Sequence, residues 1–134
     1  MPRAAGQLFV LPFRVPYCDG PTCTTRPFVS WVAVNMEPLL VLFGTSKPIS
    51  PSTAASFAGA QAAKWKGKVR LYEFANEPDL NGWDGTNYAQ ALIPAYNAIK
   101  AADPNAIVLA GALWKGNGGP VKWVTDMRCT SALP

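Results

Sequence analysis

The feature that most constrains the fold is an alternation of short apolar runs with helix-period segments, which begins at Pro38. The apolar runs cover Leu39–Phe43, Val69–Ala75 and Ile107–Leu113. The continuous Leu39–Phe43 run is typical of a parallel strand that is buried on both faces. Alternating strands and helices with short connections predict right-handed βαβ units and a parallel sheet.

The first predicted helix begins at Ser50-Pro51, because serine is a favoured N-cap and proline suits the first helical position. Gly67 is expected to end it, since glycine readily takes the left-handed conformation found after helices. Its predicted buried stripe, at helical spacing, is Ala54, Ala58, Ala62 and Trp65. The one basic cluster consists of Lys64, Lys66, Lys68 and Arg70. We interpret it as cations at the negative end of the helix dipole.

The second predicted helix covers Thr86–Ala102 and stops at Asp103-Pro104-Asn105. Pro94 lies inside it and should remove a hydrogen bond and bend the axis. Its predicted buried stripe is Tyr88, Leu92, Ala95, Tyr96 and Ile99. A further helix is expected over Val121–Met127.

Residues 1–37 contain no sustained periodicity, and we treat them as an irregular, unassigned N-terminal segment before a domain at 38–134. Cys18 and Cys23 flank a turn and allow a disulfide in an oxidising compartment, which the sequence does not decide. No apolar run approaches the roughly 20 residues of a membrane span, and the start is a poor signal peptide. We therefore expect no membrane partner. No nucleic-acid motif is recognisable either, so we expect no nucleic-acid partner.

The absence of histidine excludes whole classes of chemistry. Ser–His and Cys–His catalysis and nearly all metallohydrolase mechanisms require it. A structural zinc site needs four Cys or His ligands, and the chain has 3 cysteines. Nothing therefore calls for a metal or organic cofactor, and acid–base chemistry must come from the 8 carboxylates.

Two of these carboxylates lie at the end of the second predicted strand. Residues two apart share a face of a strand, so Glu73 and Glu77 should point the same way. The loops after the predicted strands contain no G-x-G-x-x-G and no P-loop, which disfavours a nucleotide-binding open sheet. A carboxylate at the carboxyl end of a parallel strand instead favours a barrel, whose active sites lie there.

The segment Tyr72-Glu73-Phe74-Ala75-Asn76-Glu77-Pro78-Asp79 resembles the E-x-x-N-E-P signature of glycoside hydrolase clan A. This clan consists of (β/α)8 barrels such as cellulases, β-xylosidases and α-L-iduronidases. The resemblance extends over about residues 38–127 and is similar to the β-xylosidase/α-L-iduronidase type over 87–104. It implies a TIM barrel, of which a chain of 134 residues holds roughly half, because a full barrel takes about 250.

The resemblance assigns the general acid/base role to Glu77 and a sugar-hydroxyl contact to Asn76. The chemistry agrees, since a partly desolvated carboxyl favours its protonated form and can deliver a proton to a leaving oxygen. Glu73, deeper in the strand, is expected in a structural polar network. Trp83 and Trp114 are candidate stacking surfaces for a sugar ring, with core or loop packing as the alternative; we assign Trp31, Trp65 and Trp123 to packing.

Retaining hydrolysis needs a nucleophilic carboxylate about 5–5.5 Å from the acid/base. In the clan this group comes from a later strand, and we identify no equivalent here. Asp79 and Asp84 lie close in sequence to Glu77 but match no family nucleophile, and Asp126 is expected on a helix at the wrong end.

We therefore expect a fragment of a retaining glycoside hydrolase that acts on O-glycosidic bonds in the complete enzyme. The alternatives are a non-catalytic carbohydrate-binding or assembly module, a non-functional truncated product, and a small enzyme that uses Glu77 with Asp79 or Asp84. A half-barrel has exposed sheet edges, so self-association through them is an expectation. An extracellular location is suggested by the family alone.

Overall fold

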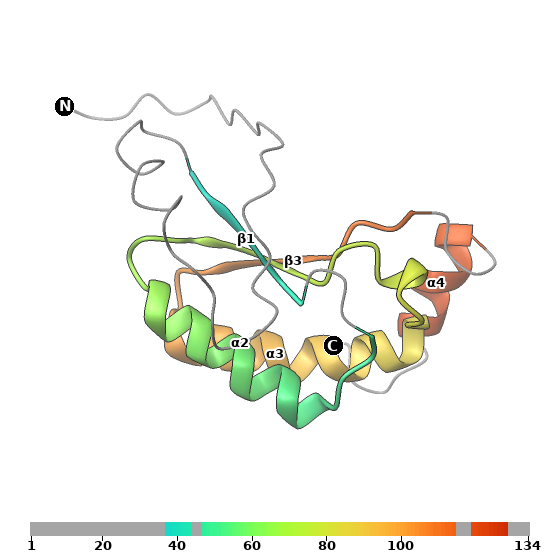
Figure 1. The fold of residues 1–134 in the computed structure, drawn as a ribbon, viewed down its shortest axis with the longest axis horizontal. Helices are drawn as coiled ribbons and strands as arrows, with labels where there is room; N and C mark the ends of the chain where they lie inside the picture. Colours follow the sequence, from blue (N-terminus) through green and yellow to red (C-terminus); the bar gives the residue numbers. More distant parts are fainter. Residues whose placement is uncertain (1–36, 44–46, 115–118, 129–134) are drawn as a thin grey trace.

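The structure, a computed structural model, describes residues 37–43, 47–114 and 119–128. The expectations for residues 1–36, including Cys18, Cys23 and Trp31, lie outside these residues. The elements in chain order are β1 (Leu39–Leu42), α2 (Pro51–Trp65), β2 (Leu71–Phe74), the short 3-10 helix η1 (Pro78–Leu80), α3 (Gly85–Ala102), β3 (Ile107–Ala110) and α4 (Gly119–Arg128) (Figure 1). No helix in the described ranges is long and apolar enough to cross a membrane.

The three strands form one parallel sheet in the order β1-β2-β3. Leu71 in β2 is the register partner of Leu39 in β1 and of Ile107 in β3. The prediction of parallel βα units is thereby confirmed. The described residues form a mixed α/β structure with three parallel strands and three α-helices, and closure into a barrel stays a prediction.

The strands are shorter than predicted, and the backbone explains where two of them stop. Phe43 follows β1 with a φ of 56°, and Ala75 follows β2 with a φ of 61°. Positive φ lies outside the extended region, so neither residue can continue its strand. Apolar character alone therefore predicted strands that ran too far.

Helix α2 begins and ends as predicted. Ser50 is the N-cap, and its Oγ accepts a hydrogen bond from the Thr53 backbone N–H at 3.1 Å. The helix ends at Trp65, and Gly67 has a φ of 75°. All four members of the predicted stripe (Ala54, Ala58, Ala62 and Trp65) are buried.

Helix α3 begins with a capping box, in which Asp84 and Asn87 each accept a hydrogen bond from the other's backbone N–H. Pro94 is accommodated inside the helix. Tyr88, Ala95 and Ile99 of the predicted stripe are buried, but Tyr96 is 45% exposed. Tyr96 is next to Ala95 in sequence, and the 100° rotation per residue places it beyond the packed face.

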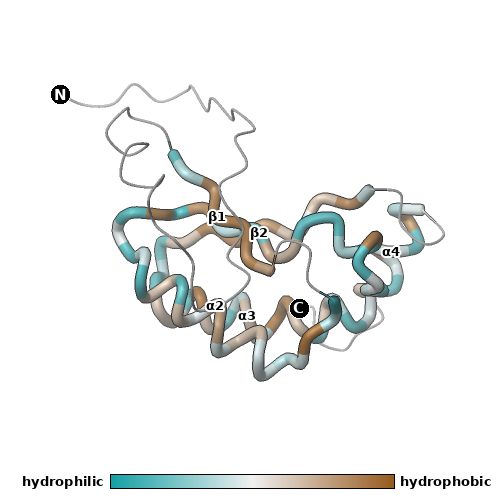
Figure 2. Tube along the Cα trace, viewed as in Figure 1, coloured by the Kyte–Doolittle hydropathy of each residue, from teal (hydrophilic) through white to brown (hydrophobic). Residues whose placement is uncertain are grey.

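The two long helices pack side by side on one face of the sheet (Figure 1). A Cβ added at Gly59 of α2 would lie 3.2 Å from the Ala98 Cβ of α3, so this glycine allows the helices to approach closely. The side chains of β1 and β2 on the helix side are fully buried: Leu40, Leu42, Tyr72 and Phe74. They join both helices in one apolar core (Figure 2).

Helix α4 packs against the start of α3. A Cβ at Gly85 would lie 2.4 Å from the Trp123 carbonyl oxygen, so only glycine fits there without a shift. Trp65 and Trp123 are both buried, which confirms their assignment to packing. On the sheet face away from the helices, Ile107 and Leu109 of β3 are exposed by 40% and 41%.

Candidate active site at the carboxyl ends of the strands

The polar groups singled out in the sequence gather where β2 and β3 end, in a region that we call the carboxyl edge (residues 75–84 and 111–114). Among the described residues, the non-glycine residues with positive φ are Phe43, Ala75 and Glu77, and each follows β1 or β2. Such conformations are costly and persist only where the surroundings hold them in place. Two of the three belong to the carboxyl edge.

The backbone of Glu77 is fixed from both sides. Its N–H donates to the carbonyl oxygen of Ala112, beyond β3, at 2.9 Å. Its own carbonyl oxygen accepts from the Leu80 N–H at 3.0 Å and from the Asn81 Nδ2 at 3.1 Å. Asn81 Nδ2 also lies 3.3 Å from the carbonyl oxygen of Asn76. These contacts explain how Glu77 is kept at a φ of 46°.

The side chains of Asn76 and Glu77 are both half-buried, and neither forms a hydrogen bond with another described residue. Their neighbours Glu73, Asp79 and Asp84 all accept hydrogen bonds from the protein. An amide and a carboxylate next to each other, whose polar atoms are not used by the described fold, can bind a polar ligand. The carboxylate can also transfer a proton to it.

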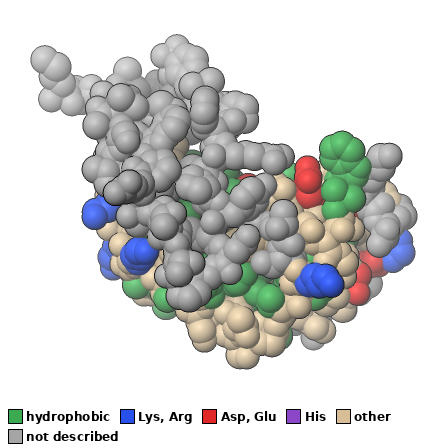
Figure 3. Space-filling view, in the orientation of Figure 1, with side chains coloured by type: hydrophobic (Ala, Val, Ile, Leu, Met, Phe, Trp, Pro, Cys, Tyr) green, Lys and Arg blue, Asp and Glu red, His purple; other side chains and the backbone are tan. Residues whose placement is uncertain are grey.

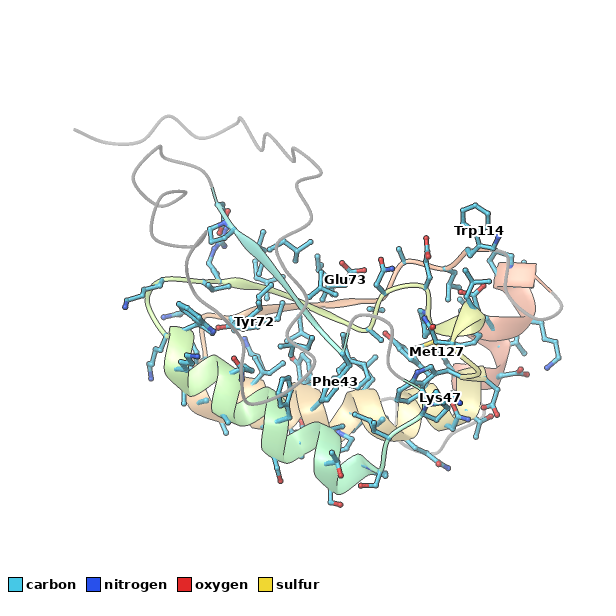
Figure 4. The ribbon with its side chains drawn as sticks, viewed as in Figure 1. Phe43, Lys47, Tyr72, Glu73, Trp114 and Met127 are labelled. Carbon is cyan, nitrogen blue, oxygen red and sulfur yellow. The ribbon has the colours of Figure 1, made fainter. Side chains whose placement is uncertain are left out.

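Glu73 points away from the helices, toward the opposite face of the sheet (Figure 4). It is half-buried, and its Oε1 accepts from the Ala112 backbone N–H at 3.0 Å. The Ala112 residue is thus bound twice, through its N–H to Glu73 and through its carbonyl oxygen to Glu77. Glu73 connects β2 to the chain after β3, as a residue of a structural polar network would.

The two candidate tryptophans differ in environment. Trp114 is 58% exposed, and its backbone N–H donates to Asp79 Oδ1 at 3.0 Å. Apolar and acidic surfaces lie side by side in this part of the molecule (Figures 3 and 4). Trp83 is only 1% exposed, and its ring meets those of Phe74 and Tyr88 edge-on. Trp83 is therefore a packing residue, whose ring is too deeply buried to offer a stacking surface to a sugar.

The remaining carboxylates have structural partners. Asp84 uses both oxygens in the capping box, accepting from the backbone N–H and the Nδ2 of Asn87. Asp126 forms an ion pair with Lys122 on α4. Among the described carboxylates, Glu77 is thus the one whose oxygens the fold does not employ. Within these same residues, no group of three or more potential metal ligands occurs.

Tyr88 contributes to the carboxyl edge in a way that the sequence interpretation missed. Its hydroxyl donates to the Phe74 carbonyl oxygen and accepts from the Gly111 N–H, both at 2.7 Å. Burial raises the pKa of this phenol well above its ordinary value. The sequence signal was the tyrosine itself, because a buried hydroxyl on an apolar stripe needs a hydrogen-bond partner.

Comparison with known proteins finds a partial sequence similarity to one enzyme. No protein-family model matches it. A stretch of 74 residues is 38% identical to the endoglucanase CelA of Streptomyces lividans, and it covers 52% of this chain and 16% of that protein. The chain thus contains a segment similar to a cellulase-type glycoside hydrolase, and it spans about a sixth of the length of this relative.

Proposed function

We propose that this chain is the part of a clan A retaining glycoside hydrolase that carries the general acid/base. In this proposal residues 38–134 belong to a (β/α)8 barrel, and the complete enzyme hydrolyses O-glycosidic bonds in a β-linked polysaccharide. The observation that carries the proposal is the state of Glu77. Its backbone is held in a strained conformation at the carboxyl end of a parallel strand, while its carboxylate has no hydrogen-bond partner among the described residues.

Each group at the carboxyl edge has a role in this chemistry. Glu77 first donates a proton to the leaving glycosidic oxygen and later takes one from the attacking water. Asn76, beside it in the chain, donates a hydrogen bond to the sugar hydroxyl next to the reacting carbon. Trp114 offers an exposed indole face for a sugar ring. The backbone N–H of Trp114 donates a hydrogen bond to Asp79, and this bond fixes Trp114 relative to the loop that carries Glu77.

None of the described carboxylates suits the second role of a retaining mechanism, that of the nucleophile. Glu73, Asp79, Asp84 and Asp126 are engaged in protein hydrogen bonds or ion pairs. The proposal therefore assigns the nucleophile to a part of the complete enzyme outside the described residues. The similar endoglucanase is much longer than the aligned stretch, which supports this assignment.

The test is an affinity label that needs no nucleophile from the protein. In N-bromoacetyl-β-cellobiosylamine, a carboxylate close to the glycosidic position displaces bromide and forms an ester. We expect mass spectrometry to locate the label on Glu77, and we expect cellotetraose to slow the labelling. The Glu77→Gln variant should remain unlabelled.

Two matched measurements complete the test. Asp126→Asn removes a partly exposed carboxylate on α4 and should leave labelling unchanged. Equal labelling of Glu77 and Asp126, without protection by cellotetraose, would contradict the proposal. Turnover of an aryl β-cellobioside by a homogeneous sample would instead show that this chain contains a nucleophile, as the small-enzyme alternative requires. Labelling of a residue other than Glu77, slowed by cellotetraose, would favour the carbohydrate-binding module.

A further inference from the structure

We propose that Tyr88 is a positioning residue, whose hydroxyl sets the spacing between the ends of β2 and β3 and thereby the place of Glu77. The geometric part stands on the contacts alone. The consequence for sugar chemistry rests on the function proposed for Glu77.

The Tyr88 hydroxyl occupies the place of a missing rung in the parallel ladder. The ladder begins with the Ile107 N–H donating to the Arg70 carbonyl oxygen at 2.7 Å. In a parallel pair the bonding residues alternate, so the Gly111 N–H and the Phe74 carbonyl oxygen have the same relation two steps further on. In the structure these two groups both bind the Tyr88 hydroxyl, each at 2.7 Å.

Beyond the hydroxyl the two chains pair again, but at a changed position. Regular alternation along β2 would next use the backbone of Asn76. The observed bond instead joins the Glu77 N–H to the Ala112 carbonyl oxygen at 2.9 Å. The inserted hydroxyl therefore coincides with the change that brings Glu77, rather than Asn76, into contact with the chain after β3. The left-handed conformations of Ala75 and Glu77 accompany this change.

Gly111 makes this arrangement sterically feasible. A Cβ at this position would lie 2.2 Å from the Ala75 carbonyl oxygen and 2.8 Å from that of Phe74. The segments that follow β2 and β3 thus lie so close together that only glycine fits at position 111 without a shift. Without the Tyr88 hydroxyl, the Gly111 N–H and the Phe74 carbonyl oxygen can be satisfied by a direct hydrogen bond to each other. That bond would pull the carboxyl edge into a different register.

The experiment compares Tyr88→Phe with Tyr72→Phe. Both tyrosines are buried, and both hydroxyls bind a backbone carbonyl oxygen, but Tyr72 reaches Val69 at the opposite end of β2. We expect Tyr88→Phe to shift the backbone amide NMR signals of Glu77, Gly111 and Ala112. Hydrogen exchange of these amides should become at least about fivefold faster, the factor expected for one lost hydrogen bond. Tyr72→Phe should leave all of these signals unchanged.

The affinity label gives the functional readout. We expect Tyr88→Phe to slow labelling of Glu77 by about fivefold or more, whereas Tyr72→Phe labels at the wild-type rate. Equal effects of the two variants on amide signals and labelling would mean that Tyr88 only adds stability, and the proposal would be wrong. If wild type is not labelled at Glu77, the proposed function fails, while the amide signals still decide the role of Tyr88.

A measurement on the wild-type protein covers the case in which Tyr88→Phe does not fold. One hydroxyl that holds both chains predicts that the Gly111 and Glu77 amides exchange through a single local opening, with the same free energy and the same dependence on denaturant. Separate openings for these two amides would overturn the inference without any variant.

Discussion

The helix-packed side of the sheet and the carboxyl edge are built on different principles. On the helix side, Leu40, Leu42, Tyr72 and Phe74 are fully buried, and regular helices cover them. At the carboxyl edge, Ala75 and Glu77 have a positive φ. Side chains there form hydrogen bonds with backbone N–H and carbonyl groups. Apolar burial stabilises the first region, whereas hydrogen bonds hold the second in an unfavourable conformation. The comparison predicts where substitutions should affect folding and where they should affect the proposed chemistry.

The largest effect is expected from Phe74→Ala, which removes a fully buried ring in contact with Phe43, Trp83 and Tyr88. Large-to-small changes of this kind cost about 3–5 kcal/mol, because a cavity remains. Urea unfolding followed by tryptophan fluorescence measures the loss. Leu80→Ala is the control at the carboxyl edge, since Leu80 is 58% exposed. Equal losses in the two variants would abolish the contrast between the regions.

Alkaline pH should weaken the helix-packed side next. Burial raises the pKa of Tyr72 to about 12, and that of Tyr88 also lies above its ordinary value. A raised pKa in the folded state leaves stability complete below about pH 10, the unfolded value, and removes it as the pH rises toward the folded value. For Tyr72 the loss is up to about 1.4 kcal/mol per pH unit between about pH 10 and 12.

Urea unfolding at a series of pH values from neutral to strongly alkaline measures this decline. In Tyr72→Phe the decline should become smaller, because one titrating phenol is absent. An unchanged slope would mean that Tyr72 ionises equally easily in the folded and unfolded chain, which contradicts its burial.

A smaller effect is expected at the junction of the two regions, where Asp84 caps α3. Asp84→Ala removes the acceptor for the Asn87 N–H and should cost about 1–2 kcal/mol. Asp84→Asn keeps an oxygen acceptor and should recover most of this loss in the same unfolding measurement. Because Tyr88 is the residue one turn into α3, Asp84→Ala should also speed hydrogen exchange of the Gly111 amide. Exchange that stays at the wild-type rate would separate the cap from the carboxyl edge.

The smallest effect tests the strain at the carboxyl edge. Left-handed backbone costs a non-glycine residue about 1–2 kcal/mol, and Glu77 has a φ of 46°. Glu77→Gly should therefore be about 1 kcal/mol more stable than Glu77→Ala, with both unlabelled by the bromoacetyl cellobioside. The same pair at Glu73, where no positive φ occurs, should show the opposite order. A more stable Glu77→Ala would show that the site stores no strain.

Periodicity made the helix-packed side predictable. The stripe of α2, the Ser50 N-cap and the parallel pairing of the strands all followed from local chemistry and spacing. The shared strand face predicted for Glu73 and Glu77 failed beyond Phe74, because it assumes a continuous strand. The left-handed conformation at Glu77 is held by its N–H bond to the Ala112 carbonyl oxygen and by the bond that its own carbonyl oxygen accepts from Asn81. Neither partner can be recognised from the sequence. Exposure of Tyr96 and burial of Trp83 were likewise decided by packing between elements.

Helix α4 contacts the carboxyl edge indirectly, through the side chain of Tyr88. Trp123 of α4 packs on Gly85 at the first turn of α3. Its ring also packs against that of Tyr88, with 5.6 Å between the ring centroids. We therefore expect a displacement of α4 to move the Tyr88 ring, and with it the hydroxyl that bridges β2 and the chain after β3. A partner that binds α4 would then change the position of Glu77 without contacting it.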